Sequence, residues 1–244
     1  MDVGKAVGFV FEDEQWVSKI LLGAVIGLIP IFGSLALTGY GITVVRNVRQ
    51  GTARPLPGWD RVGEYFVDGL LFWIALLVYS IPLLIMICPL VFVWLVPLAV
   101  ADSGDLPAVL GGLAGIVSAG VGCLAFLYAL ILWVLYPVLQ IRYAEAGKLA
   151  ACLRFGEVFR FLSANIGQVI LAQLVVWAAA VIVSTGLSLV MGVLGLIPVC
   201  GWVIAALLGF AFLPVGVWLI LLAGHLYGQI GIQPMAELAS LPGS

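Results

Sequence analysis

The feature that most constrains this chain is the length of its uncharged stretches. Four segments contain no Asp, Glu, Lys or Arg: residues 20–45, 69–101, 106–141 and 161–236. Each is longer than the roughly 20 apolar residues that cross the hydrocarbon core of a bilayer. With 64% hydrophobic and 9% charged residues, the chain cannot cover a soluble domain with polar surface. The sequence therefore predicts an all-α, polytopic transmembrane helical bundle.

The basic residues indicate the orientation of this bundle. All ten Lys and Arg residues can be placed on one side of the membrane. One group, Arg46 to Arg61, follows the first apolar stretch, and a second, Arg142 to Arg160, follows the third. The segment 101–105 between the second and third stretches contains Asp and no base. Because loops rich in Lys and Arg stay inside the cell, we expect both basic loops and both termini in the cytoplasm. No basic region precedes a short apolar core at the amino terminus, so we expect no cleaved signal peptide.

A repeated Gly-Pro motif sets the expected number of helices. The stretch GLIPIFG at 27–33 is matched by GLIPVCG at 195–201. Since Gly and Pro together mark turns, we expect an outer-face turn at each copy. The result is about six helices (five to seven), with Pro82, Pro89, Pro97 and Pro214 expected to kink two of them. Residues 17–48 could instead form one long kinked helix. With the turn, residues 16–28 rise only about 20 Å, which leaves a half or a full span open.

The two basic loops resemble each other, which predicts internal repeats at 33–100 and 111–194 within one membrane domain, 1–244, that ends in a short cytoplasmic tail, 232–244. Arg61–Phe66 matches Arg154–Phe159, and Tyr40, Arg46 and Gly51 have the spacing of Tyr136, Arg142 and Gly147. Each repeat would contain a helical hairpin and an amphipathic segment at the cytoplasmic interface. In the first segment we expect the aromatic rings of Trp59, Tyr65 and Phe66 to lie at headgroup level. Residues 7–16 could be a degenerate third copy.

Several of these residues resemble a known family. They are Asp13, Trp16 to Lys19, Gly39-Tyr40, Arg46, Leu56 to Asp60, Phe66 to Gly69, and Tyr79 to Pro82. The pattern is similar to the prokaryotic membrane family named domain of unknown function 4013, although Gly58 stands where that family usually has an acidic residue. The resemblance implies a multi-pass protein of a bacterial or archaeal cell membrane, and it carries over no catalytic residues.

Two ionisable residues are the sharpest candidates for function. Asp68 lies where an apolar stretch begins, and ionisable groups at membrane depth are often functional. A carboxylate that caps the start of a helix explains it more simply, and this is the interpretation we favour. A buried pair with Arg46 or Arg142 is the alternative. His225 is the only histidine. It could relay protons, but a packed or interfacial histidine is the favoured interpretation.

The remaining candidates are uncharged. Tyr40, Tyr136 and Tyr227 lie near the cytoplasmic ends of three predicted helices, where an aromatic belt is favoured over a gating ring. The polar residues Asn165, Gln168, Gln173 and Gln140 could line a cavity, although hydrogen bonds between helices are favoured. Abundant glycine predicts close helix packing.

No motif in the sequence indicates catalysis. No HExxH, GxSxG or phosphate-binding loop occurs, and no pair of carboxylates lies inside an apolar stretch. The four cysteines are scattered without a CxxC pair, so we expect packing residues and neither metal nor cofactor. No basic cluster fits nucleic acid. The favoured function is a non-enzymatic accessory, interaction or lipid-associated protein whose partners are membrane lipids, a second copy or another membrane protein. A channel or transporter for a small or apolar solute is the alternative.

Overall fold

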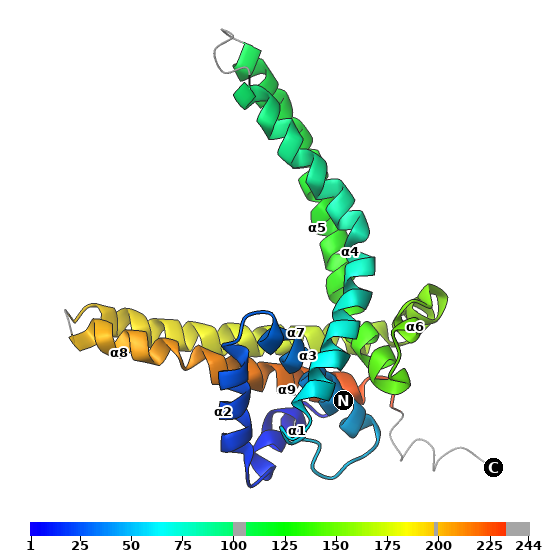
Figure 1. Cartoon of the computed structure of the whole chain (residues 1–244), viewed down its shortest axis with the longest axis vertical. Helices are drawn as coiled ribbons and strands as arrows, with labels where there is room; N and C mark the ends of the chain where they lie inside the picture. The colour runs from blue at the N-terminus through cyan, green and yellow to red at the C-terminus, as the bar shows by residue number, and fades with distance from the viewer. Residues whose placement is uncertain (100–105, 198–199, 233–244) are drawn as a thin grey trace. The chain divides into compact units, whose positions relative to one another are not determined.

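A computed structural model describes residues 1–99, 106–197 and 200–232 of the chain. Within these residues every regular element is a helix, which confirms the predicted all-α class (Figure 1). The chain divides into two compact units. The first unit consists of Met1–Trp73 together with Pro137–Ser244, and the second unit consists of Ile74–Tyr136.

The first unit begins with short helices. Asp2 caps α1 (Val3–Gly8), and its carboxylate accepts a hydrogen bond from the Lys5 amide at 2.9 Å. A 3-10 helix, η1 (Phe9–Glu12), leads to α2 (Trp16–Gly27) and α3 (Phe32–Arg49). The turn predicted at Pro30 separates α2 from α3 and is confirmed. One long helix over residues 17–48 is therefore wrong, because the backbone at Ile31 takes a non-helical φ of 64°.

Glycines bring the neighbours of α3 into backbone contact. A Cβ atom on Gly39 would lie 1.9 Å from the carbonyl oxygen of Tyr65 in α4 (Val62–Ala99). A Cβ atom on Gly69 would lie 1.9 Å from the carbonyl oxygen of Leu35. On the other neighbour, α9 (Phe212–Gln229), a Cβ atom on Gly224 would lie 2.9 Å from the carbonyl oxygen of Gly41. Only residues without a side chain permit such distances, so the predicted close helix packing is confirmed around α3.

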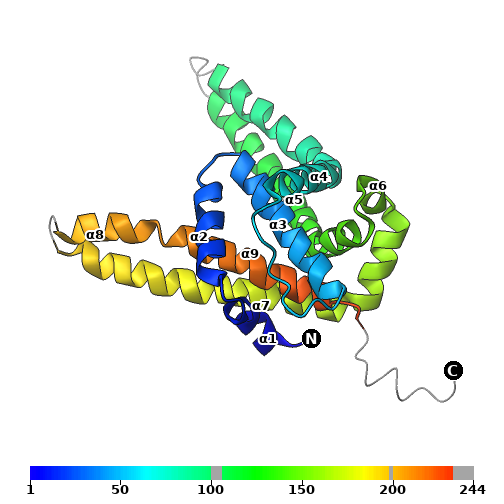
Figure 2. The ribbon, with the colours of Figure 1, turned by 60° about the horizontal axis from the view of Figure 1, so that its bottom comes forward.

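The other helices are α5 (Leu106–Ala146), α6 (Leu149–Cys152), α7 (Phe155–Gly195) and α8 (Cys200–Gly209). Figures 1 and 2 show α7 beside α8 and α9 within the first unit. The helical structure is interrupted between α8 and α9, shortly before Pro214, where the sequence predicts a kink. In contrast, α4 continues through Pro82, Pro89 and Pro97 as one helix.

Four segments of the described residues are long and apolar enough to cross a membrane: Val62–Ala99, Ala108–Ala146, Phe155–Gly195 and Gly201–Gln229. The chain is therefore a multi-pass membrane protein with a helical bundle fold. Two of the six predicted helices do not reach this standard. The helix α2 has only 12 residues. The helix α3 is long enough, but Arg46, Asn47 and Arg49 make its last turns polar.

The second unit is a helical hairpin. Residues 74–99 of α4 and residues 106–136 of α5 run side by side in both ribbon views (Figures 1 and 2). The Tyr128 hydroxyl donates to the carbonyl oxygen of Tyr79 at 2.8 Å, and the Trp94 indole donates to the Ser118 hydroxyl at 2.9 Å. These bonds join the two helices where the rest of their surface is apolar.

The expected interfacial segments take another form. Residues 62–66 are the first turns of α4 and residues 155–159 are the first turns of α7, so neither is a separate helix. The Tyr65 side chain is only 2% exposed, and Trp59 packs beside it. The prediction of a ring at headgroup level is wrong for Tyr65, because the protein covers this side chain; for the half-buried Trp59 and Phe66 it stays a prediction.

The internal repeats stay a prediction, but the two predicted copies share one feature of backbone conformation. Gly51 and Gly147, which match in the sequence, both take a positive φ, at 70° and 61°. Each follows a helix that carries arginine, and glycine reverses the chain there without steric cost. The acidic segment 101–105, the motif residues Pro198 and Val199, and residues 233–244 of the predicted tail lie outside the described residues.

Candidate functional site

An aromatic cluster holds the loop before α4 against α3. The rings of Tyr40 and Trp59 stack with centroids 4.1 Å apart, and Tyr65 meets both rings edge-on. The Tyr40 hydroxyl donates to the carbonyl oxygen of Pro57 at 2.9 Å, and the Tyr65 hydroxyl donates to that of Gly58 at 2.7 Å. Each buried hydroxyl thus has a partner, as burial requires. Tyr40 is fully buried, so the favoured aromatic belt is wrong for this residue.

Lys19 ties the same loop to the start of α2. Its ammonium donates to the Asp13 carboxylate at 2.7 Å and to the carbonyl oxygen of Leu56 at 3.3 Å. Burial alone would raise the pKa of Asp13. The hydrogen bonds from Lys19 and from the Gln15 amide, with the charges of Lys19 and Arg54, outweigh burial and lower that pKa. Asp13 is therefore held as a carboxylate that positions Lys19.

Asp68 belongs to an ion pair and not to a helix cap. It lies inside α4, which begins at Val62, so the favoured capping interpretation is wrong. Its Oδ2 accepts from Arg46 Nη2 at 3.3 Å, and its Oδ1 accepts from the Tyr143 hydroxyl at 3.1 Å. Arg46 Nε also donates to the carbonyl oxygen of Ala144. This contact is one of the two pairs that the sequence leaves open, and it joins α3, α4 and α5.

A second group of charges continues from this pair. Arg49 and Arg142 share the Glu145 carboxylate, and Arg142 and Arg154 share the Glu157 carboxylate. Arg49 also donates to the carbonyl oxygen of Ile230, which follows α9, at 2.8 Å. The ends of α3, α5 and α9 and the start of α7 thus meet in one charged network. We call this group, with Arg46 and Asp68, the arginine network.

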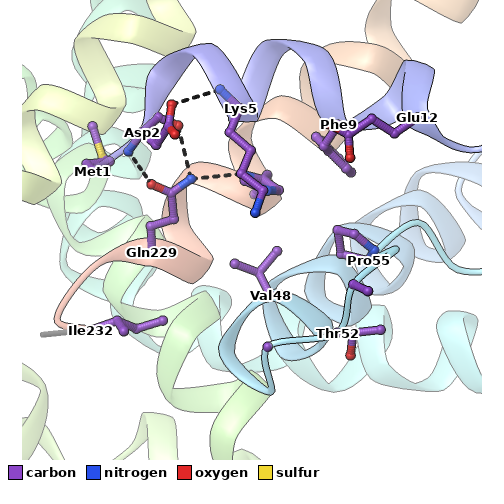
Figure 3. Close-up of a pocket in the computed structure, with 13 residues that line it drawn as sticks. Met1, Asp2, Lys5, Phe9, Glu12, Val48, Thr52, Pro55, Gln229 and Ile232 are labelled. Carbon is purple, nitrogen blue, oxygen red and sulfur yellow. Dashed lines mark hydrogen bonds between the residues drawn. The ribbon is translucent and has the colours of Figure 1, made fainter. Parts of the chain in front are cut away.

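A cavity of about 320 Å³ lies between the start of the chain, the loop after α3 and the end of α9 (Figure 3). The side chain of Lys5 extends from α1 into it. Among the described residues, the Lys5 ammonium forms no ion pair. Phe9, Val48, Pro55 and Ile232 supply an apolar lining, and Asp2 and Glu12 add two carboxylates.

His225 lines this cavity with a defined tautomer. Oε1 of Gln229 accepts from the Asp2 amide at 2.6 Å, and its Nε2 donates to the Asp2 carbonyl oxygen and to His225 Nδ1. A backbone amide can only donate and a carbonyl can only accept, which fixes the orientation of the Gln229 side chain. Nδ1 of His225 is then the acceptor, and the proton of the neutral ring lies on Nε2.

The packed interpretation of His225 is the one that agrees with its surroundings. Its side chain is 3% exposed, and its ring stacks on Phe9 with centroids 4.4 Å apart. Among the described residues, the hydrogen-bond partner of His225 is the amide of Gln229 and not a hydroxyl, thiol or carboxylate. The histidine therefore lacks the partner that a nucleophilic pair needs.

The predicted polar residues bond in different ways. Gln168 accepts from the Gly231 amide at 2.9 Å, which links α7 to the end of α9. Asn165 donates to the carbonyl oxygen of Phe161 in its own helix, at a point where the backbone of α7 leaves helical geometry. Gln140 is buried in α5. Gln168 thus holds the chain after α9, and Asn165 bonds within α7; the favoured bond between helices is found for Gln173, which accepts from Tyr227.

The other two tyrosines of the expected ring differ from each other. Tyr227 is 2% exposed, and its hydroxyl donates to Gln173 at 2.5 Å, which joins α9 to α7. The belt interpretation is therefore wrong for Tyr227 as well. Tyr136 is half-buried and belongs to the second unit. Of the cysteines, Cys152 is buried, and burial raises its pKa to about 11, partly offset by Arg142. Cys88 and Cys123 are exposed on α4 and α5.

Sequence reasoning missed the partners of several candidates. Gln229, Gln173 and Glu157 bond to His225, Tyr227 and Arg142, and the sequence did not indicate these pairings. The spacing of Gln229 four residues after His225 on one helix is the only local signal, since such residues face the same side. The other contacts join segments far apart in the sequence, where no periodicity indicates them.

Comparison with known proteins finds a match to a sequence model of a protein family. A family model described as "Protein of unknown function (DUF4013)" matches residues 22–195, which include the aromatic cluster and all charged residues of the arginine network. No curated protein and no solved structure matches the chain.

Proposed function

The chain belongs to the DUF4013 family of proteins of unknown function, and from that premise we propose that it is a non-enzymatic, lipid-associated accessory protein of a bacterial or archaeal cell membrane. The observation that carries this proposal is the exposure of its apolar helices. Only 6% of the most apolar window of Val62–Ala99, Ala108–Ala146 and Gly201–Gln229 is buried, and 17% of that of Phe155–Gly195. Such surfaces require lipid or other membrane components around them.

The polar groups support this proposal by their position. Charged side chains of the arginine network bond to one another at helix ends, where they hold helices together. The cavity at His225 also lies at helix ends, next to α1 and the loop after α3. A transporter places its polar groups near the middle of its spans, where they face the solute. Among the candidates for such a position, Gln168 bonds to the chain after α9 and Asn165 bonds within its own helix.

The proposed orientation places both basic loops and both termini in the cytoplasm. The contacts of Asp2 with Gln229, and of Arg49 with Glu145 and Ile230, bring the amino-terminal segment and the ends of α3, α5 and α9 to one side of the first unit. This side carries most of the positive charge, and positive charge favours the inner face.

Cysteine labelling in intact cells tests the orientation. In a variant without native cysteines, Thr52→Cys should resist an impermeant thiol reagent, and Ser103→Cys should react with it. Both should react after the cells are lysed. The reverse pattern would contradict the proposed orientation.

The proposed function is tested with purified protein in two assays. Native mass spectrometry should show phospholipid retained on the protein. Planar bilayers and osmotic swelling of vesicles should show no conduction of small ions or neutral solutes. A conductance or swelling that depends on the protein and changes in a His225→Ala or Gln168→Ala variant would overturn the proposal in favour of a channel. Protein that retains no lipid would also contradict it.

A further inference from the structure

We infer that the hollow between the end of α5 and the start of α7 binds the phosphate group of an anionic phospholipid. This inference rests on the proposed lipid-associated function and names the ligand and its site. The hollow has a volume of about 230 Å³. Its lining consists of Arg142, Glu145, Ala146, Lys148, Ala150, Ala151 and Arg154.

The chain creates this hollow by a sharp reversal after α5. Gly147 has a φ of 61°, and its amide donates to the carbonyl oxygen of Tyr143 at 2.8 Å, which ends the helix. The short helix α6 then carries the chain to Arg154, directly before α7. Three alanines face the space between these elements. Because their side chains are single methyl groups, the hollow between the surrounding bases stays open.

The charges around the hollow do not balance. Arg49, Arg142, Lys148 and Arg154 supply four positive charges, and Glu145 and Glu157 supply two negative ones. Each of the two glutamates already forms ion pairs with two arginines. Among the described residues, the Lys148 ammonium forms no ion pair, and the buried Nε of Arg142 has no acceptor. The bases around the hollow can therefore pair with a further anion.

The position of the hollow favours a lipid as the source of that anion. It lies where the apolar segment Ala108–Ala146 ends and where Phe155–Gly195 begins. Phe155 and Phe159, next to the bases, are each 49% exposed. Aromatic rings and bases on one segment are typical of the level of the lipid headgroups. Arginine and lysine together match the geometry and the charge of a phosphate group.

Lipid binding measured by native mass spectrometry tests the inference. The detergent-purified chain is titrated with dioleoylphosphatidylglycerol and, separately, with dioleoylphosphatidylcholine. We expect a clear preference for phosphatidylglycerol. Removing two bases in Lys148→Gln/Arg154→Gln should lower the affinity for phosphatidylglycerol about 25-fold, since each base near an anionic headgroup contributes a factor of roughly five.

Arg54→Gln/Arg61→Gln is the matched control. It removes the same charge, and Arg61 resembles Arg154 because each is exposed and pairs with the glutamate three residues later, at 3.4 Å and 3.3 Å. Neither Arg54 nor Arg61 lines the hollow. The control should keep the preference. Equal losses in the two double variants would overturn the assigned site.

A steric variant and a phosphate arm complete the test. Ala150→Trp fills the hollow without changing its charge and should also lower the affinity for phosphatidylglycerol, provided that its melting temperature matches wild type. Inorganic phosphate at the same concentration should compete weakly. If inorganic phosphate displaces phosphatidylglycerol completely, the hollow is a site for free phosphate, and the inference is overturned. If the Lys148→Gln/Arg154→Gln protein still prefers phosphatidylglycerol, the assignment of the site is wrong, but the proposed lipid-associated function is not contradicted. If wild type retains no lipid at all, the proposed function is itself wrong.

Discussion

The first and second units are both mostly apolar, yet their helices are held in different ways. In the first unit, Gly39 and Gly69 bring α3 and α4 into backbone contact, and the arginine network and the aromatic cluster join the helix ends. In the second unit, a Cβ atom on Gly115 or Gly120 would meet nothing within 4 Å. The described residues of the second unit contain no Asp, Glu, Lys or Arg. Apolar composition thus determines that a helix enters the membrane, whereas glycine contacts and ion pairs determine which helix it packs against.

The largest expected effect comes from adding one methyl group in the first unit. Gly39→Ala would place its Cβ 1.9 Å from the Tyr65 carbonyl oxygen, so α3 and α4 must separate. We expect a loss of about 3 kcal/mol in the free energy of unfolding, measured by denaturation in mixed micelles. Gly120→Ala in the second unit is the control and should change stability by less than about 0.5 kcal/mol. Equal effects would remove the distinction between the two units.

The second effect comes from the ion pair of α3 and α4. Asp68→Asn leaves Arg46 without its carboxylate, and we expect a loss of about 2 kcal/mol. Breaking a fully buried pair costs about 3–5 kcal/mol, but these side chains are 30% and 21% exposed, and solvent reduces the cost. Glu64→Gln, also in α4, breaks an exposed pair with Arg61, which directly precedes the helix, and should cost less than about 1 kcal/mol. Thermal melts compare the two variants. If Asp68→Asn is harmless, the ion pair with Arg46 does not hold α3 and α4 together.

A smaller effect, of opposite sign, is expected at the turn between α2 and α3. Ile31 has φ 64° and ψ −61°, and the Phe32 amide donates to the Pro30 carbonyl oxygen at 2.7 Å. These values describe a γ-turn that is strained for a β-branched residue. Ile31 is 77% exposed, so Ile31→Gly loses little packing and should raise stability by about 1 kcal/mol. Ile29→Gly, outside the strained position, should lower it. A melting temperature for Ile31→Gly at or below that of wild type would contradict the strain.

The smallest effect is the dependence of stability on pH through Asp13. Its pKa is lower in the folded state than the ordinary value of 3.8, so the folded state binds this proton less readily than the unfolded chain does. The resulting stabilisation is complete above that value and is lost as the pH falls through the folded pKa. Melting temperatures of wild type and Asp13→Asn should converge below about pH 4. If the difference between them stays constant from pH 6 to pH 3, Asp13 is not linked to folding.

Particular residues show how far the sequence could be read. The uncharged stretches and the turn at Pro30 were predictable, because hydrophobic length and proline act locally. The partner of Asp68 was not: the sequence narrowed it to Arg46 or Arg142, and capping appeared simpler. The segment with Trp59 and Tyr65 has the composition of an interfacial segment, and only the packing of Tyr65 against Tyr40 and the loop before α4 shows that the Tyr65 ring is buried.

By itself, the sequence determined that this chain is a helical membrane protein, that it turns at Pro30, and which family it belongs to. These properties follow from hydrophobicity, charge and Gly-Pro patterns that act over a few residues. Only the tertiary structure decided which charged groups pair, where α3 meets its neighbours, and that Arg142 in α5, Lys148 before α6 and Arg154 before α7 surround one hollow. Those contacts join residues far apart in the chain, and their energies depend on distances and burial that no local pattern contains.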